Sequence, residues 1–484
     1  MSLKPSVIVW FRQDLRITDN PALAAAAQSG HPIRALYVLD EDSDGIRAHG
    51  GASRWWLHNS LESLTDGLLT RGLTLTRRRG PAADVIADLI EETGASAVYW
   101  NRCYEPWAVA RDTAIKEQLK ERGVEAESFN GSLLLEPWQI KTGQGGPYKV
   151  FTPFWKQLRD IYRLPSAVDI SDDLPCATDV RSDDLADWGL LPTAPDWADG
   201  IRAAWTVGED AARNLLADFL DGPVSDYPDD RNRPDRVGTS RLSPYLHWGE
   251  IGPDQVWRAA VPLLDKGGAT ARGAESLLRE LAWRDFNHHL VFHFPEIATE
   301  NWKSQFNDFS WRDDPEGLAA WQQGCTGYPI VDAGMRELWH TGWMHNRVRM
   351  VVGSFLIKDL LVHWRDGEAW FWDTLVDADL ANNVGNWQWV AGSGADASPF
   401  FRIFNPITQG EKFDPEGDYV RRWVPELGNV PAKWIHKPWE APEEVRSQAG
   451  VRLGEDYPEP RVNHRVARDR ALAAYKSLRE EESD

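Results

Sequence analysis

The chain has 484 residues, and its 74 acidic and 53 basic side chains give a net charge of −21 at neutral pH. It is 42% hydrophobic and contains 26 Trp, enough apolar surface for a large core, so the composition excludes a disordered protein. Its three cysteines exclude a disulfide framework and predict a reducing, cytoplasmic setting, and no apolar run has the length of a membrane span. The excess of acidic residues by itself argues against a nucleic-acid partner.

The negative charge is concentrated in one stretch of the chain. Residues 160–235 carry 18 acidic and 6 basic side chains, a net charge of −12, whereas residues 1–150 carry a net charge of −2. The first part of this stretch is rich in Asp, Pro and Ser, a composition typical of linkers. A charge placed in a linker says little about a binding face elsewhere, so it does not exclude DNA.

Apolar runs alternate with segments of helical periodicity over the first 130 residues. The strand-like runs are 7–10, 33–39, 73–76, 97–100 and 124–129, and the helix-like segments between them are 21–28, 53–70, 82–93 and 108–122. Five strands with short crossovers predict an α/β domain over residues 1–135, built on a doubly wound parallel sheet. The turn after the first strand has no glycine, so no dinucleotide-binding fingerprint is expected there.

The pattern changes after a predicted linker over residues 136–207. Residues 208–484 show almost no strand alternation and predict an all-helical domain. The amphipathic segments are 208–221, 253–264, 274–293, 331–342, 345–363, 367–376 and 463–481. The predicted fold class is therefore α/β plus all-α.

Three places in the helical part gather polar and aromatic side chains. The run 377–389 mixes carboxylates, amides and indoles without a helical apolar stripe, a combination typical of ligand sites. The segment 238–243 offers hydroxyls and backbone donors suited to a phosphate. Glu280 lies three and four residues before Trp283 and Arg284, on one helical face. Each has a plainer explanation: packed indoles, a Ser/Thr helix cap, or a solvated ion pair.

Three histidines, His288, His289 and His293, share one predicted helix. His289 and His293 are four residues apart and could bind one metal ion. No acidic third ligand lies near them in register, so we interpret them as histidines packed among apolar residues and predict no metal site.

Six sequence blocks together resemble the photolyase/cryptochrome family, in order and at family-like spacing from about residue 6 to about residue 475. The blocks are VIVWFRQDLR (7–16), GTSRLSPYL (238–246), ELAWR (280–284), TGYPIVDA (326–333), MHNRVRM (344–350) and FRIFNP (401–406). The resemblance implies an N-terminal antenna domain, a long linker, and a C-terminal helical domain that binds FAD and DNA.

The resemblance also implies the residues that bind FAD. Those around the diphosphate and ribityl chain would be Tyr227, Thr239, Ser240, Leu242 and Ser243. Arg284 would line the flavin pocket, Arg349 and Asp377 would pair beside the isoalloxazine, and Asp379 would lie along the adenosine and ribityl side. Asn383 would face flavin N5 and stabilise the reduced cofactor. Trp387, Trp364 and Trp311 match the family's electron-transfer triad.

The implied activity is light-driven repair of pyrimidine dimers in UV-damaged DNA by electron transfer from photoexcited, reduced FAD. The lesion pocket would comprise Glu280, Trp283, Asn346, Met350 and Trp389, and the candidate phosphate contacts are Arg402, Arg347 and Arg241. Enzymes that repair (6-4) photoproducts typically carry His where this chain has Asn346 and Met350, so cyclobutane dimers are the favoured substrate and (6-4) photoproducts the alternative.

Segment 51–60 resembles class III photolyases and favours methenyltetrahydrofolate as the antenna chromophore, with 8-hydroxy-5-deazaflavin as the alternative. The candidate contacts are Glu41, His49 and Arg54.

Two other functions are weighed. A blue-light cryptochrome photoreceptor would keep FAD and the Trp triad, but Asn383 and the intact lesion pocket favour repair; a light-independent flavoprotein oxidoreductase would need a nicotinamide site, which the sequence lacks. We expect a monomer.

Overall fold

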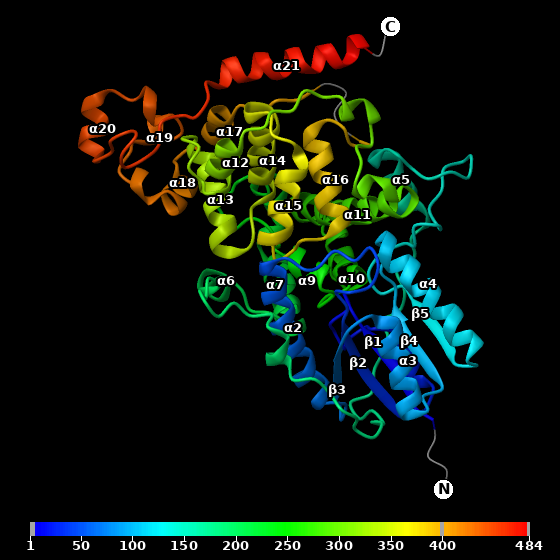
Figure 1. The fold of residues 1–484 in the computed structure, drawn as a ribbon. Coiled ribbons are helices and arrows are strands. Elements are labelled where there is room, and N and C mark those ends of the chain that lie inside the picture. The colour runs from blue at the N-terminus through cyan, green and yellow to red at the C-terminus, as the bar shows by residue number, and fades with distance from the viewer. Residues whose placement is uncertain (1–4, 397–400, 482–484) are drawn as a thin grey trace.

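The computed structural model of the chain describes residues 5–396 and 401–481. The N-terminal part contains a five-stranded parallel sheet in the order β3-β2-β1-β4-β5, with β1 (Val7–Phe11) pairing with both β2 (Ile33–Leu39) and β4 (Ala97–Asn101). The edge strands are β3 (Leu75–Arg79) and β5 (Glu125–Phe129), and the crossover helices are α1 (Pro21–Gln28), α2 (Gly51–Leu69), α3 (Ala82–Thr93) and α4 (Pro106–Glu121). The predicted doubly wound sheet is confirmed (Figure 1).

The third strand begins two residues later than predicted and continues through three arginines to Arg79. Its polar residues extend the strand because β2 pairs with one edge and the acidic stretch binds the other, where Asp183 N donates to Arg77 O at 2.8 Å. Further along, Ile33 N donates to Pro175 O at 2.6 Å and Ala177 N to Ile33 O at 2.9 Å. The part of the acidic stretch around residues 175–183 is therefore held along the sheet by backbone hydrogen bonds, whereas residues from 209 onward belong to the helical part.

The predicted linker, 136–207, contains α5 (Phe151–Ile161), the 3₁₀ turn η1 (Leu185–Trp188) and α6 (Asp199–Ala204). Its domain boundaries stay a prediction. The remaining helices form the C-terminal part, above the sheet in Figure 1. They are α7 (Glu209–Asp221), α8 (Tyr227–Asp230), α9 (Ser243–His247), α10 (Pro253–Leu264), α11 (Gly268–His293), α12 (Pro315–Gln322), α13 (Pro329–Thr341), α14 (Asn346–Ser354), α15 (Trp364–Thr374), α16 (Leu380–Ala391), α17 (Pro406–Phe413), α18 (Asp418–Trp423), α19 (Ala432–Ile435), α20 (Glu443–Ala449) and α21 (His464–Glu481).

Two helices differ from the sequence prediction. The segment 345–363 is not one helix, because α14 passes into a π-helical turn, η5 (Phe355–Leu360), which ends at Leu361 with φ of 60°. Conversely, the run without an apolar stripe forms α16, whose first turn is capped by Asp379 accepting from Asn382 N at 2.7 Å. That helix carries polar residues on an inward face because the face lines a cavity.

The α/β and helical parts are docked closely. Gly249 has φ of +68°, and a Cβ there would lie 2.1 Å from the carbonyl oxygen of Gln13, so glycine is needed for this approach. Nearby, the fully buried Glu250 accepts from Ser60 Oγ at 2.7 Å and from Trp56 Nε1 at 3.3 Å, both on α2. Among the helices of the described residues, none combines the length and apolar character needed to cross a membrane.

Candidate functional site

A cavity of about 710 Å³ opens in the helical part between α8, α9, α11, α14 and α16. It is lined by predicted residues of both the cofactor and the lesion sets: Tyr227, Ser240, Leu242, Ser243, Glu280, Trp283, Arg284, Asn346, Arg349, Met350, Asp377, Asp379, Asn383, Trp387 and Trp389. Thr239 neighbours the lining residue Ser240 without lining the cavity itself, and Arg402, Trp364 and Trp311 lie outside the wall. Residues as far apart in sequence as Tyr227 and Trp389 thus meet around one space.

Helix α11 presents one face to this cavity, and Glu280, Trp283 and Arg284 all lie on it. Glu280 does not pair with Arg284, so the solvated ion pair within the helix is a wrong explanation. Its carboxylate instead lies 2.6 Å from Arg231 Nη1, while Arg284 donates to the carbonyls of Ser132 and Leu246. The result is a carboxylate on the cavity wall that is held by the residue directly after α8.

The indole of Trp283 stacks on Phe151, with ring centroids 3.7 Å apart and planes 8° from parallel. Trp389 lines the same cavity from α16. Two indoles from different helices therefore form part of the wall near Glu280, a surface suited to flat aromatic or unsaturated rings.

An ion pair crosses another part of the wall. Arg349 Nη2 donates to both carboxylate oxygens of Asp377, at 2.8 and 3.1 Å, and Arg349 Nε donates to Met344 O at 2.8 Å. Arg349 lies on α14, whose N-terminus is capped by His345 Nδ1 accepting from Arg347 N at 3.2 Å. The fork of hydrogen bonds fixes the guanidinium against the cavity.

Asp379 lies between two buried histidines. Its Oδ2 is 3.3 Å from His288 Nε2 and 3.7 Å from His247 Nδ1. Burial alone would raise the pKa of Asp379, but the two imidazoles outweigh it and hold that pKa well below its usual range. Burial likewise disfavours charged His288, yet Asp379 raises the pKa of that imidazole. The prediction that His288 packs only among apolar residues is therefore wrong.

The amide of Asn383 is oriented by Glu368 on α15. Asn383 Nδ2 donates to Glu368 Oε1 at 2.8 Å and to Glu368 O at 3.1 Å. Both amide hydrogens are used in these bonds, which leaves Oδ1 as the atom offered to the cavity. Sequence comparison by motif did not find Glu368, because it belongs to none of the six blocks.

Two residues of the wall carry buried side-chain nitrogens with no hydrogen bond among the described residues. One is His247, which is 5% exposed and reaches Asp379 only at 3.7 Å from Nδ1, and the other is Trp387, at Nε1. Buried polar atoms normally find a partner, so these indicate a ligand in the cavity. The volume, the hydroxyls of Ser240 and Ser243, and the cation of Arg349 fit a bound FAD.

Of the three triad tryptophans, Trp387 and Trp364 are buried and Trp311 is half-buried. Trp387 lines the cavity and packs closely on Gly367. A Cβ at position 367 would lie 2.2 Å from the indole of Trp387, so no larger residue fits there. Trp364 is 1% exposed and donates from Nε1 to Asn301 Oδ1 at 2.8 Å, and Trp311 is half-buried. The arrangement suits a relay from the surface, and the role of each indole stays a prediction.

The three candidate phosphate contacts differ in position. Arg402 is exposed, and Arg347 lines the cavity and donates to Asn232 Oδ1 at 2.6 Å. Arg241, however, packs with its guanidinium 4.1 Å from the ring of Trp205 and 5.1 Å from that of Trp343. Its cation is taken up by aromatic packing, so Arg241 is a poor candidate for a phosphate.

Several lining residues escaped the sequence analysis: Arg231, Asn232, His247, Asn382 and Asn386. Arg231 follows Tyr227 by four residues, a spacing that places it on the same face as a residue already singled out. The contact between His288 and Asp379 has no signal in the sequence, because the two residues come from different elements.

The three candidate antenna contacts do meet. Arg54 pairs with Glu41 and donates from Nε to His49 O at 3.2 Å. Glu41 and His49 line a cavity of only about 40 Å³ together with Arg47 and Trp372, and burial lowers the pKa of His49 to about 3. This space holds only a few water molecules, so a folate or a deazaflavin would bind there only after lining side chains had moved aside.

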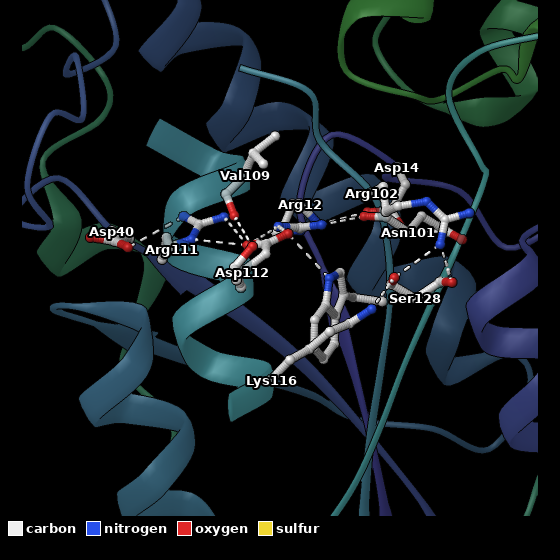
Figure 2. Close-up of polar contacts among 12 residues, drawn as sticks. Arg12, Asp14, Asp40, Asn101, Arg102, Val109, Arg111, Asp112, Lys116 and Ser128 are labelled. Carbon is white, nitrogen blue, oxygen red and sulfur yellow. Dashed lines mark hydrogen bonds and ion pairs between the residues drawn. The ribbon is translucent and has the colours of Figure 1, made fainter. Parts of the chain in front are cut away.

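The sheet's strand order reverses between β1 and β4, the place where open α/β sheets commonly bind ligands. Here the carboxyl ends of those strands are filled by side chains of the chain itself (Figure 2). Arg12 pairs with Asp112 at 2.7 Å, and Arg111 bridges Asp112 and Asp40 at 3.1 and 3.3 Å. A chromophore at this edge would have to displace buried ion pairs.

Comparison with known proteins follows the same division of the chain. The family described as DNA photolyase matches residues 7–175, and the FAD binding domain of DNA photolyase matches residues 277–477. A deoxyribodipyrimidine photo-lyase of Agrobacterium fabrum is 51% identical over 99% of both chains, and cryptochrome-2 of Arabidopsis thaliana is 39% identical over 99% of this chain and 80% of its own. The crystal structure of a bacterial class III photolyase from Agrobacterium tumefaciens superposes with a TM-score of 0.95 at 51% identity, covering 99% of each chain. The chain therefore belongs to the photolyase/cryptochrome family, with an α/β domain and a helical FAD-binding domain.

Proposed function

We propose that this chain is a deoxyribodipyrimidine photolyase that uses light to split cyclobutane pyrimidine dimers in DNA. The observation that carries the proposal is the single cavity described above. Residues assigned by motif to the flavin and residues assigned to the lesion line one continuous space, so a cofactor and a flipped-out dimer bound there would be close enough for electron transfer.

FAD, when bound and reduced, supplies the electron on absorbing blue light. The chain's own groups would hold it: Arg349 with Asp377 beside the ring system, Asp379 with its two histidines, and Asn383 toward N5. These fixed polar groups would keep water from the ring and give a rigid pocket.

The dimer has to leave the DNA stack to reach the cavity, as photolyases are known to require of their substrate. Trp283 and Trp389 would pack on the extruded pair, with Met350 on its apolar side. Glu280 would accept from the N3 edge of one base, and Arg231 beside it would balance the negative charge that an added electron places on the bases.

Trp387, Trp364 and Trp311 would re-reduce oxidised cofactor by passing an electron inward from the surface. Indole is readily oxidised, and burial of the first two keeps the intermediate positions dry. A packing role does not compete with this proposal, because a packed indole can also transfer an electron.

A folate antenna, with Glu41, His49 and Arg54 as contacts, is the finer part of the proposal. Support comes from the meeting of these three residues near the domain junction. A pterin would enter only if side chains such as Trp372 moved aside, because the present space is about 40 Å³. An action spectrum of repair distinguishes the chromophores: a folate adds a band in the near ultraviolet, a deazaflavin one at longer wavelength, and no added band contradicts an antenna.

A repair assay tests the main proposal. Purified, photoreduced protein is mixed with an oligonucleotide containing one defined cyclobutane dimer and exposed to blue light, with a (6-4) oligonucleotide and a dark sample alongside. We expect light-dependent loss of the cyclobutane dimer alone. Loss of the (6-4) product would reassign the substrate, and loss of neither would favour a photoreceptor, as in the cryptochrome relatives at 39% identity.

A further inference from the structure

Arg47 lies in the loop before α2, in the α/β part, but its side chain ends on the helical part. Its Nη1 donates to Glu368 Oε1 on α15 at 2.7 Å, and its guanidinium lies 4.3 Å from the ring centroid of Trp372. The loop is fixed there by Trp372 Nε1, which donates to Ala48 O at 2.9 Å. Figure 1 shows the start of α2 meeting the lower end of α15.

One carboxylate oxygen is shared by two donors. Glu368 Oε1 accepts from Arg47 at 2.7 Å and from Asn383 Nδ2 at 2.8 Å, and the Glu368 side chain is only 8% exposed. A carboxylate paired with a guanidinium accepts hydrogen bonds and cannot donate one. Asn383 must therefore turn its NH₂ toward Glu368 and its oxygen toward the cavity. Without Arg47, the Glu368 carboxylate would lose the donor that fixes it, and the Asn383 amide would be free to turn over.

We infer that Arg47 is a positioning residue for the flavin, which through Glu368 fixes the oxygen of Asn383 toward N5. The inference rests on the proposed flavin site. Reduced flavin carries a hydrogen on N5, whereas N5 of oxidised flavin offers a lone pair. An amide oxygen therefore favours the reduced cofactor and an amide N–H favours the oxidised one, so a residue of the antenna domain shifts the redox equilibrium of a cofactor bound in the other domain.

The test is an equilibrium redox titration of purified, FAD-loaded protein without DNA, followed by flavin absorbance. In R47M, which keeps the length of the side chain and removes its charge, we expect the ratio of reduced to oxidised flavin at a given potential to fall about tenfold. For a two-electron couple that is about 30 mV. E368Q should shift the ratio in the same direction, because a glutamine N–H can bond the oxygen of Asn383.

Two comparisons separate positioning from a general loss of structure. The double variant R47M/E368Q should shift the ratio no further than the larger single effect, because both act through one contact chain. The control is R78M, which removes an arginine of the same domain that pairs with Glu92 at 2.9 Å on α3. R78M should match the wild type.

A wild-type potential in R47M, with E368Q shifted, would overturn the role of Arg47, and so would shifts that add in the double variant. If R47M fails to retain FAD, R47A replaces it, since alanine also removes the donor to Glu368 and brings no long side chain into the loop; an unshifted R47A would equally overturn the inference. The readout is the flavin potential in the absence of DNA, so a failed repair assay leaves this result standing on its own.

Discussion

The carboxylate of Glu280 is held 2.6 Å from the guanidinium of Arg231, and both side chains face the same cavity. Glu280 comes from α11 and Arg231 directly follows α8. A dimer that hydrogen-bonds Glu280 would therefore bind beside a fixed positive charge. The pair makes Glu280 a group oriented before substrate arrives.

Replacing Glu280 by Ala should slow dimer splitting about tenfold or more while FAD stays bound. The reason is the loss of one hydrogen bond to a charged group, worth about 1.5–3 kcal/mol. Single-turnover flash experiments on photoreduced protein measure the splitting rate, and flavin absorbance after gel filtration measures retention. The matched control is E275A on the same helix, which removes an exposed partner of Arg159. Equal rates in E280A and E275A would remove Glu280 from the mechanism.

Replacing Trp364 by Phe should reduce photoreduction of oxidised FAD at least tenfold, because Phe is much harder to oxidise than Trp. Repair by protein reduced chemically with dithionite should be unchanged, since the relay is then not needed. The two readouts are flavin bleaching under blue light with an external donor, and dimer loss in the pre-reduced sample. W257F serves as control, because Trp257, on α10, is buried against Tyr162 and lies outside the relay. Normal photoreduction in W364F would contradict the assignment.

Stability should decrease as pH rises from about 4.5 to about 8 because of Glu250. Burial raises the pKa of this carboxyl from its ordinary 4.5 to about 8. The folded chain therefore holds a proton that the unfolded chain releases, and its stabilising effect is complete below pH 4.5 and lost as pH rises through 8. The expected contribution is on the order of a few kcal/mol.

Urea unfolding at pH 5 and pH 8 measures this difference. In E250Q the side chain cannot ionise, so the change in unfolding free energy between the two pH values should be smaller than in the wild type. An equal change in E250Q would assign the pH dependence to other buried carboxyls. Glu337 and Asp285 are such groups, because burial raises the pKa of each to about 7.

The binding of lesion DNA should weaken with salt, and Arg402 should account for part of the slope. If it contacts one phosphate, R402A should reduce the slope of log K against log salt concentration by about one. Filter binding or fluorescence anisotropy measures this slope, at NaCl concentrations from about 50 to about 200 mM. R452A is the control, since Arg452 is exposed and pairs with Asp456 in the C-terminal part. An unchanged slope in R402A would exclude that phosphate contact.

Local signals in the sequence were sufficient for the regular elements. Helices 21–28 and 82–93 have the predicted bounds, because Pro21 occupies the first turn of α1 and Gly94, with φ of +65°, ends α3. Helix α16 was harder to predict. Its cavity-facing side is polar, so the apolar stripe that normally identifies a helix is missing.

Residues of the cavity wall were predictable where they belong to a sequence motif. They were not predictable where only a tertiary contact brings them together. Glu280, Trp283 and Arg284 are neighbours in sequence, and their common face follows from helical spacing. Arg47 and Glu368 are 321 positions apart. No periodicity connects such residues, and the loop that carries Arg47 contains no family block, so only the fold reveals the contact.

The acidic stretch also affects how the protein approaches a polyanion. Its part over residues 169–188 lies along the sheet, anchored to Ile33 and Arg77, whereas residues from 209 onward belong to the helical part, in which the cavity opens. Residues 169–188 carry seven acidic side chains and one basic side chain, a net charge of −6, beside the sheet. Near DNA, the field of the phosphates repels this part of the surface and favours an approach by the helical part. The net negative charge thus biases which encounters are productive, and added salt should weaken that bias.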